Sequence, residues 1–200
     1  MLIIGLTGGI GSGKSEAARV LERLGAVIVN ADLAGHEAYR SGSEAWHAIV
    51  QAFGDSVVGP GGEIERKVLG AIVFGDPTQL RRLNEIVWPE IRRILQARIE
   101  AERLAGRANA VIVEAAVLLE AGWDDLVDEV WLVDASDALV SRRLQAKGIS
   151  PDQARARMRA QHSSEARWAR ADVVIRNDGD LSALEAAVRK AWNGRVETKA

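Results

Sequence analysis

The stretch Gly8-Gly9-Ile10-Gly11-Ser12-Gly13-Lys14-Ser15 decides the fold class, because it satisfies the pattern G-x-x-x-x-G-K-[S/T]. It follows the apolar run Leu2–Leu6 and precedes a helical pattern over Ser15–Leu24, which is the strand–loop–helix setting that this motif requires. Glycines let backbone N–H groups surround a phosphate, and the helix N-terminus adds its positive dipole end. The stretch therefore predicts a binding site for a nucleoside triphosphate with Mg²⁺.

Lys14 and Ser15 are the chemically specific residues of this phosphate loop. The Lys14 ammonium is expected to reach the β- and γ-phosphates, and the Ser15 hydroxyl is expected to hold Mg²⁺. A dinucleotide loop is excluded because G-x-G-x-x-G is absent, and the N-K-x-D of a switch GTPase is absent too. The alternative is a glycine-rich turn with an exposed lysine. The predicted nucleotide-binding residues are Gly8, Gly9, Gly11, Ser12, Gly13, Lys14, Ser15 and Glu16.

Five short apolar runs predict buried strands, and helical patterns lie between them. Continuous apolar runs are typical of a parallel sheet that is covered on both faces, so an α/β fold is expected. Pro89 is expected to kink or divide the helical pattern from Pro77 to Leu104. Helix starts are expected at Asp76, at the capping box Ser150–Gln153 with a helix to Gln161, and at Asp180. The predicted strands are Leu2–Leu6, Val27–Val29, Ala110–Val113, Glu129–Val133 and Asp172–Ile175.

Composition limits the class of protein. The chain has 200 residues, no cysteine, 48% hydrophobic and 27% charged residues, and a net charge of −2. These values indicate one globular domain and exclude a disulfide scaffold, thiolate metal sites and a cysteine nucleophile. The charge argues against a nucleic-acid partner. No apolar stretch is long enough to span a membrane, so a cytoplasmic location is the default expectation.

The charge is distributed unevenly along the chain. Residues 111–140 hold eight acidic and no basic side chains, whereas residues 141–170 hold eight basic and two acidic ones. The basic segment could close over phosphates, could be a solvated helix face, or could pair with the acidic segment. Its basic residues are Arg142, Arg143, Lys147, Arg155, Arg157, Arg159, Arg167 and Arg170.

Several further segments resemble one family, the dephospho-coenzyme A kinases. Gly5–Ser15 matches the family's opening, and Asn30-Ala31-Asp32 resembles its Asp-Ala-Asp step. The stretch Glu114–Trp123 is especially similar to the kinase half of the bifunctional coenzyme A synthases. The remaining matches, which extend the resemblance from about residue 2 to 190, are Arg66, Leu69, Val73-Phe74, Leu83-Asn84, Leu118-Leu119-Glu120, Gln161, Arg167, Ala171-Asp172, Val174-Ile175, Asn177 and Gly179.

The resemblance implies a three-layer P-loop NTPase fold with a five-stranded parallel sheet, a helical substrate domain and a lid. ATP would phosphorylate the ribose 3′-hydroxyl of dephospho-coenzyme A, in a monomer or weak oligomer with no nucleic-acid or membrane partner. The implied core is residues 1–32, 108–140 and 171–194, the substrate insertion 33–107, the lid 141–170 and a polar tail 195–200. The implied catalytic residues are Asp32 as general base, Lys14 and Arg142; those near the substrate are Asp32, Arg66, Trp88, Glu114 and Lys147; Asn177 would adjoin the adenine.

Each of these roles has an ordinary alternative. Asp32 could cap the helix after Ala31, Glu114 could be a carboxylate that supports Lys14, and Arg66 could pair with Glu63 or Glu65. The chain also departs from the family pattern, with Trp88 in place of histidine, Asn30 in place of aspartate, and Ala146-Lys147-Gly148 where Arg-Asp is usual. Another small-molecule kinase, for a nucleoside, nucleotide or shikimate, and a nucleotide-binding regulatory module are the competing functions.

Overall fold

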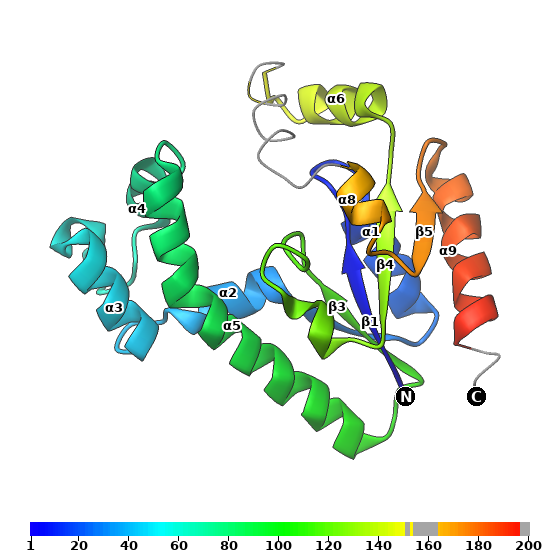
Figure 1. The fold of residues 1–200 in the computed structure, drawn as a ribbon, viewed down its shortest axis with the longest axis horizontal. Coiled ribbons are helices and arrows are strands. Elements are labelled where there is room, and N and C mark those ends of the chain that lie inside the picture. Colours follow the sequence, from blue (N-terminus) through cyan, green and yellow to red (C-terminus); the bar gives the residue numbers. More distant parts are fainter. Residues whose placement is uncertain (151–152, 154–163, 197–200) are drawn as a thin grey trace. The chain divides into compact units, whose positions relative to one another are not determined.

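A computed structural model describes residues 1–150, 153 and 164–196 of the chain (Figure 1). Its chain divides into two compact units, Met1–Asn30 with Ile99–Ala200, and Ala31–Arg98. In the described part, no helix combines the length and apolar character needed to cross a membrane.

The first unit is built on a five-stranded parallel sheet of order β2-β3-β1-β4-β5. All five predicted strands are confirmed, each within one residue at either end, and the prediction of an α/β fold with a parallel sheet is confirmed with them. The strands are β1 Leu2–Thr7, β2 Val27–Asn30, β3 Ala110–Glu114, β4 Glu129–Asp134 and β5 Val173–Arg176.

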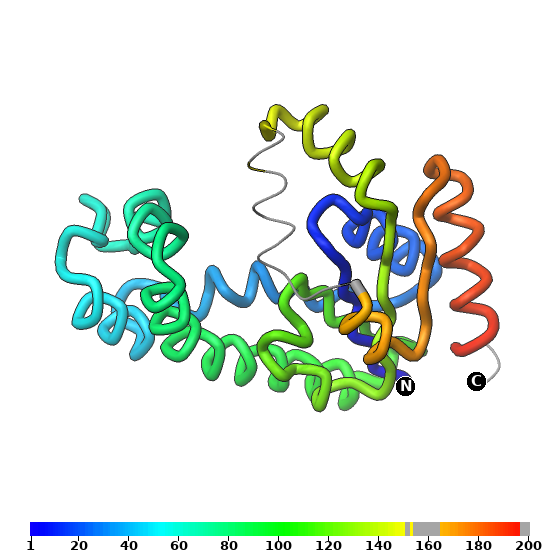
Figure 2. Tube along the Cα trace, turned by 45° about the horizontal axis from the view of Figure 1, so that its top comes forward, coloured from blue at the N-terminus to red at the C-terminus, as the bar shows by residue number. Residues whose placement is uncertain are grey.

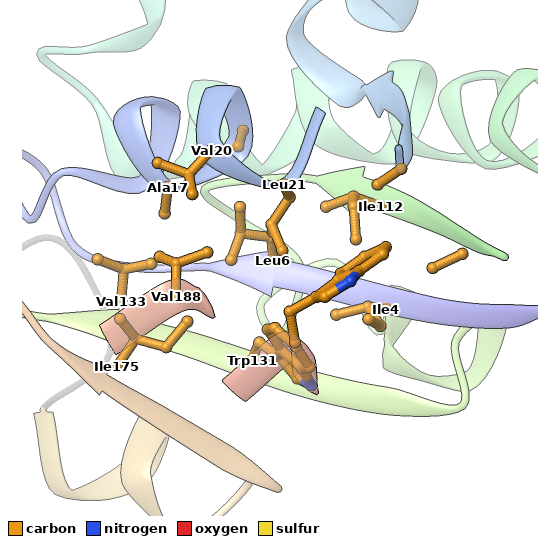
Figure 3. Close-up of a cluster of buried hydrophobic side chains, with 14 of the residues drawn as sticks. Ile4, Leu6, Ala17, Val20, Leu21, Ile112, Trp131, Val133, Ile175 and Val188 are labelled. Carbon is orange, nitrogen blue, oxygen red and sulfur yellow. The ribbon is translucent and has the colours of Figure 1, made fainter. Parts of the chain in front are cut away.

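Helices α1 (Lys14–Arg23) and α9 (Leu181–Arg195) cover one face of this sheet. Because side chains alternate across a strand, Ile4 and Leu6 of β1 face these helices, where Leu21 and Val188 pack among them (Figure 3). On the other face, Gly5 leaves room for Leu118, since a Cβ at Gly5 would lie 2.6 Å from Leu118 Cδ2. Burial on both faces explains why the strands are continuous apolar runs rather than alternating ones.

Shorter elements complete the first unit. The 3₁₀ helix η2 (Trp123–Leu126) precedes β4, α6 (Asp137–Ala146) follows it, and α8 (Ser164–Trp168) precedes β5. The end of the chain differs from the expected polar tail, because Arg195 is the last residue of α9 and Val196 is 3% exposed in the main core. The remaining tail residues, 197–200, lie outside the described residues.

The second unit is helical and is drawn in blue to green in Figure 2. Helix α2 (Ala31–Ala38) is followed by α3 (Glu44–Phe53), η1 (Asp55–Val57), α4 (Arg66–Val73) and α5 (Pro77–Ala105), whose last residues belong to the first unit. The glycine-rich segment 54–62 separates α3 from α4. Pro89 lies inside α5, which is one continuous helix and is not divided there.

Local cap signals in the sequence correspond to real hydrogen bonds. Asp76 Oδ1 accepts from the Thr78 amide at 2.8 Å directly before α5, and Asp180 Oδ1 accepts from the Ala183 amide at 2.9 Å before α9. Ser150 and Gln153 form the reciprocal capping box, with the Gln153 amide donating to Ser150 Oγ at 3.3 Å. The helix predicted to follow, up to Gln161, falls outside the described part of the chain.

Candidate active site

The phosphate loop lies between β1 and α1, at the edge of the sheet where its strands end. It borders a cavity of about 710 Å³, a size typical of small-molecule sites. Gly13 precedes α1 and offers no side-chain cap, which leaves the first N–H groups of the helix to an anionic ligand. The cavity residues are Gly8, Gly9, Ile10, Gly11, Gly13, Lys14, Ser15, Glu16, Ala116, Arg143, Leu144, Ala146, Lys147, Asn177, Gly179, Asp180, Leu181 and Leu184.

Two glycines of the loop are required by its close contacts. A Cβ at Gly8 would lie 2.5 Å from the Val133 carbonyl oxygen and 2.6 Å from Ser12 Oγ. A Cβ at Gly13, whose φ is +100°, would lie 2.1 Å from Asn177 Nδ2. Ser12 is 2% exposed, and its hydroxyl has no hydrogen-bond partner among the described residues. The loop is therefore packed tightly against β4 and the end of β5.

Glu114 connects the two chemically specific residues of the loop. Its Oε1 accepts from Lys14 Nζ at 3.2 Å and from Ser15 Oγ at 2.8 Å, and its Oε2 accepts from Asn30 Nδ2 at 2.8 Å. Burial alone would raise the pKa of Glu114, but the Lys14 charge and the hydrogen bonds from Ser15, Lys14 and Asn30 outweigh burial and lower the pKa below its ordinary value. Of the roles considered for Glu114, these contacts favour support of Lys14.

The basic residues of α6 differ in where they lie. Val140 and Leu144 pack with Ala135, Ile10 and Ile149 in a small apolar cluster, which we call the α6 cluster. This packing places Arg143 and Lys147, four residues apart, along the cavity, whereas Arg142 is exposed and does not line it. Sequence reasoning selected Arg142 and Lys147. Arg143 precedes Lys147 by four residues, and residues at this spacing lie on the same face of a helix. This spacing could have identified Arg143 from the sequence.

Arg143 connects α6, the phosphate loop and the end of β5. Its Nη1 donates to the carbonyl oxygens of Gly11 at 3.4 Å and Ser12 at 3.3 Å, and its Nη2 donates to the main-chain and side-chain oxygens of Asn177 at 3.1 and 3.2 Å. Asn177 is buried and donates from Nδ2 to the Ser12 carbonyl at 2.7 Å. Among the described residues, Arg143 has only these neutral partners, so its charge is available to an anion in the cavity.

We expect Arg143→Gln to weaken ATP binding at least about tenfold, since a hydrogen-bonded charge contributes about 1.5–3 kcal/mol. Arg142→Gln tests the assignment of Arg142 as a catalytic residue. If that assignment holds, the loss of this solvent-facing cation lowers turnover and leaves ATP affinity unchanged. Isothermal titration with ATP and steady-state kinetics measure the two effects, and Arg103→Gln serves as an exposed control outside the cavity. Equal ATP affinity of the Arg143 variant and the parent protein would contradict the prediction.

The rest of the basic segment is partly paired. Arg170 forms an ion pair with Asp124 of the acidic segment 111–140, which supports the pairing alternative for that residue. The Nε of Arg167 is buried without a hydrogen-bond partner in the part of the chain that the structure describes. Arg155, Arg157 and Arg159 lie outside the described residues.

The second unit holds the other predicted residues. Asp32 is exposed in the first turn of α2, inside the helix rather than at its cap. Arg66 begins α4 and contacts His36 Nε2 and the ring of Tyr39, at 5.9 Å from the ring centroid, instead of the neighbouring glutamates. Trp88 is half-buried on α5.

The parallel sheet with a phosphate loop between its first strand and first helix defines a P-loop fold of the kinase type. Shikimate kinase from Acinetobacter baumannii has this fold, with a TM-score of 0.56 and 14% identity over all of this chain and 95% of its own. The family is shown by a sequence model, described as dephospho-CoA kinase, that matches residues 2–183. The chain belongs to the dephospho-CoA kinase family.

Individual relatives agree with this family. The dephospho-CoA kinase of Geobacter sulfurreducens is 44% identical over 196 residues, which cover 98% of this chain and 99% of that protein. The solved dephospho-CoA kinase of Campylobacter jejuni has a TM-score of 0.73 and 22% identity, with 99% of this chain and 98% of that one covered. Similarity thus extends over the whole chain, not only over the phosphate loop.

Proposed function

We propose that this protein transfers the γ-phosphoryl group of ATP to the ribose 3′-hydroxyl of dephospho-coenzyme A, giving coenzyme A and ADP. The observation that carries the proposal is the family match over residues 2–183, which includes the phosphate loop and the helical second unit. The shikimate kinase similarity supports the fold only, because its sequence identity is 14%. It does not favour shikimate as the acceptor.

In the proposed reaction, the 3′-oxygen attacks the γ-phosphorus while the bond from that phosphorus to the β,γ-bridging oxygen breaks. The hydroxyl proton passes to a base and then to solvent, and ADP leaves with the bridging oxygen. Such transfers have a loose transition state, so the protein contributes mainly by positioning the reactants and stabilising charge. Lys14, Arg143 and Lys147 line the cavity as cations for this purpose, and Arg142 is retained as a further lid candidate.

The donor set at the loop fits Mg²⁺ held together with a nucleotide. The Ser15 hydroxyl donates a hydrogen bond to Glu114, which leaves the lone pairs of the Ser15 oxygen available to a cation. Across residues 1–150, 153 and 164–196, no group of three His, Cys, Asp or Glu side chains is placed to hold a metal ion. Mg²⁺ is commonly bound by one or two protein ligands together with substrate phosphates and water. When bound, Mg²⁺ would offset the negative charge of the transferring phosphoryl group. Ser15 is the proposed protein ligand.

The acceptor side of the reaction is assigned to the second unit. We assign the general base to Asp32 and contact with a substrate phosphate to Arg66, whose guanidinium is held by His36 and Tyr39. Trp88 offers an aromatic surface to the adenine or to the pantetheine arm of the substrate. Glu114 supports the loop from beneath, and Asn177 borders the proposed adenine side of the cavity. The cytoplasm is the proposed place of action.

The decisive experiment measures ADP release with Mg·ATP and a panel of acceptors: dephospho-coenzyme A, nucleosides, nucleoside monophosphates and shikimate. ADP is expected with dephospho-coenzyme A, and ³¹P NMR should show a new phosphate on the 3′-oxygen. A 3′-deoxy analogue of the acceptor should give no ADP above background. Absence of ADP with dephospho-coenzyme A, or faster release with another acceptor, would overturn the proposal.

A further inference from the structure

Two neighbouring strands end side by side beneath the phosphate loop. Asn30 is the last residue of β2 and Glu114 the last residue of β3, and the two are Cα partners in the parallel register. Parallel strands lie about 4.8 Å apart, so residues paired in register project to the same side of the sheet. Asn30 Nδ2 accordingly donates to Glu114 Oε2 at 2.8 Å.

The opposite oxygen of the same carboxylate serves the phosphate loop. Glu114 Oε1 accepts from Lys14 Nζ at 3.2 Å and from Ser15 Oγ at 2.8 Å. The carboxylate is planar, so a bond that fixes Oε2 also fixes the direction in which Oε1 faces. Glu114 is only 5% exposed, and a buried carboxylate needs hydrogen-bond donors in place of water.

We propose that Asn30 is a positioning residue: its amide holds the Glu114 carboxylate, and Glu114 in turn holds the Lys14 ammonium and the Ser15 hydroxyl ready for Mg·ATP. The inference rests on the proposed function only as far as nucleotide binding, and it does not depend on the acceptor. Asn30 does not touch the nucleotide in this scheme. It acts through Glu114.

The amide is suited to this position because it donates a hydrogen bond and carries no charge. In this chain an aspartate at position 30, which is the family's usual residue there, would remove the donor to Glu114 Oε2 and place a second carboxylate against it, with the single Lys14 ammonium shared between two negative charges. Like charges in contact disfavour each other strongly in a buried site. The expected response is displacement of Glu114 from Lys14 and Ser15.

The test uses Asn30→Ala and Asn30→Asp in the full-length protein, with Mg·ADP and Mg·ATP binding measured by isothermal titration in the absence of any acceptor. Each variant is expected to raise the Kd of the Mg-nucleotide about tenfold, which corresponds to about 1.4 kcal/mol. The Mg²⁺ concentration needed for half-saturation should rise in parallel. Asn109→Ala is the matched control, since Asn109 is an exposed asparagine directly before β3, and it should bind as the parent protein does.

A double-mutant cycle decides whether Asn30 acts through Glu114. In the Glu114→Gln background, Asn30→Ala should add less than a twofold change in Kd, because the carboxylate to be positioned is gone. Asn30→Asp with Glu114→Gln should bind more tightly than Asn30→Asp alone, because one negative charge is removed. Thermal unfolding of every variant checks that the comparison concerns folded protein, and Asn30→Asp, nearly equal in shape, provides a second variant if Asn30→Ala fails to fold.

Parent-like Kd values in both single variants, or equal effects of Asn30→Ala with and without Glu114, would overturn the inference. Failure of the acceptor assay would leave these binding measurements intact. The two proposals can therefore fail separately.

Discussion

Gly13→Ala is expected to weaken ATP binding about 30-fold or more, because the new methyl group has no room and the backbone resists it. The Cβ would lie 2.1 Å from Asn177 Nδ2, so Asn177 must move and lose its bond to the Ser12 carbonyl. An unsatisfied buried acceptor costs about 1–3 kcal/mol. The left-handed φ of +100° adds about 1–2 kcal/mol of strain for a residue with a Cβ, and because Gly13 lies in the phosphate loop, the free protein is expected to relieve both costs by leaving the conformation that binds ATP.

Isothermal titration with Mg·ATP measures the effect, and Gly25→Ala separates its two causes. Gly25 has a φ of +94° at the end of α1, and a Cβ there would meet nothing within 4 Å. Gly25→Ala should therefore lower the melting temperature through backbone strain, with ATP affinity within about twofold of the parent protein. ATP affinity at the parent level in Gly13→Ala would show that the loop tolerates displacement of Asn177.

Asp32→Asn is expected to lower kcat about 10²- to 10⁴-fold, the usual contribution of a general base. The amide keeps the shape of the side chain but cannot take the hydroxyl proton. Asp32 is exposed in the first turn of α2, so the exchange removes only a weak helix-dipole interaction of about 0.3–1 kcal/mol. Folding and ATP affinity should stay close to those of the parent protein.

Steady-state kinetics with dephospho-coenzyme A, together with ATP titration, separate loss of chemistry from loss of binding. Asp55→Asn is the control, since Asp55 is an exposed aspartate of the same helical unit with no assigned role. A kcat within twofold of the parent value in Asp32→Asn would remove Asp32 as the base.

Features encoded locally could be predicted from the sequence. Apolar runs such as Leu2–Leu6 identified the strands, because burial on both faces leaves no polar alternation to confuse the pattern. The phosphate loop followed from a motif whose glycines and lysine have separate physical reasons. Asp76 and Asp180 indicated where α5 and α9 begin, because each accepts a capping hydrogen bond from an amide only two or three residues later.

Features that depend on spatial neighbours could not be predicted in the same way. The Asn30–Glu114 bond requires β2 to lie beside β3, although 79 residues separate the two strands. No local pattern specifies that strand order. Which of Arg142 and Arg143 lines the cavity depends on which face of α6 packs against Ile10. The two residues are neighbours in the sequence, so a helical pattern alone does not distinguish them. Pro89 was expected to kink or divide the helical pattern, and of these two alternatives division is excluded, because α5 is continuous at that residue.

The small size of the α6 cluster has a consequence for hydrogen exchange. Helix α6 rests on Val140 and Leu144 against Ala135, Ile10 and Ile149, apart from the large core that α1 and α9 share with the sheet. A helix with so little buried apolar surface opens locally at a lower free energy than the global unfolding of its domain. Amide protons of α6 should thus exchange much earlier than those of β1. Bound nucleotide, which would engage Arg143 and the phosphate loop together, should slow their exchange.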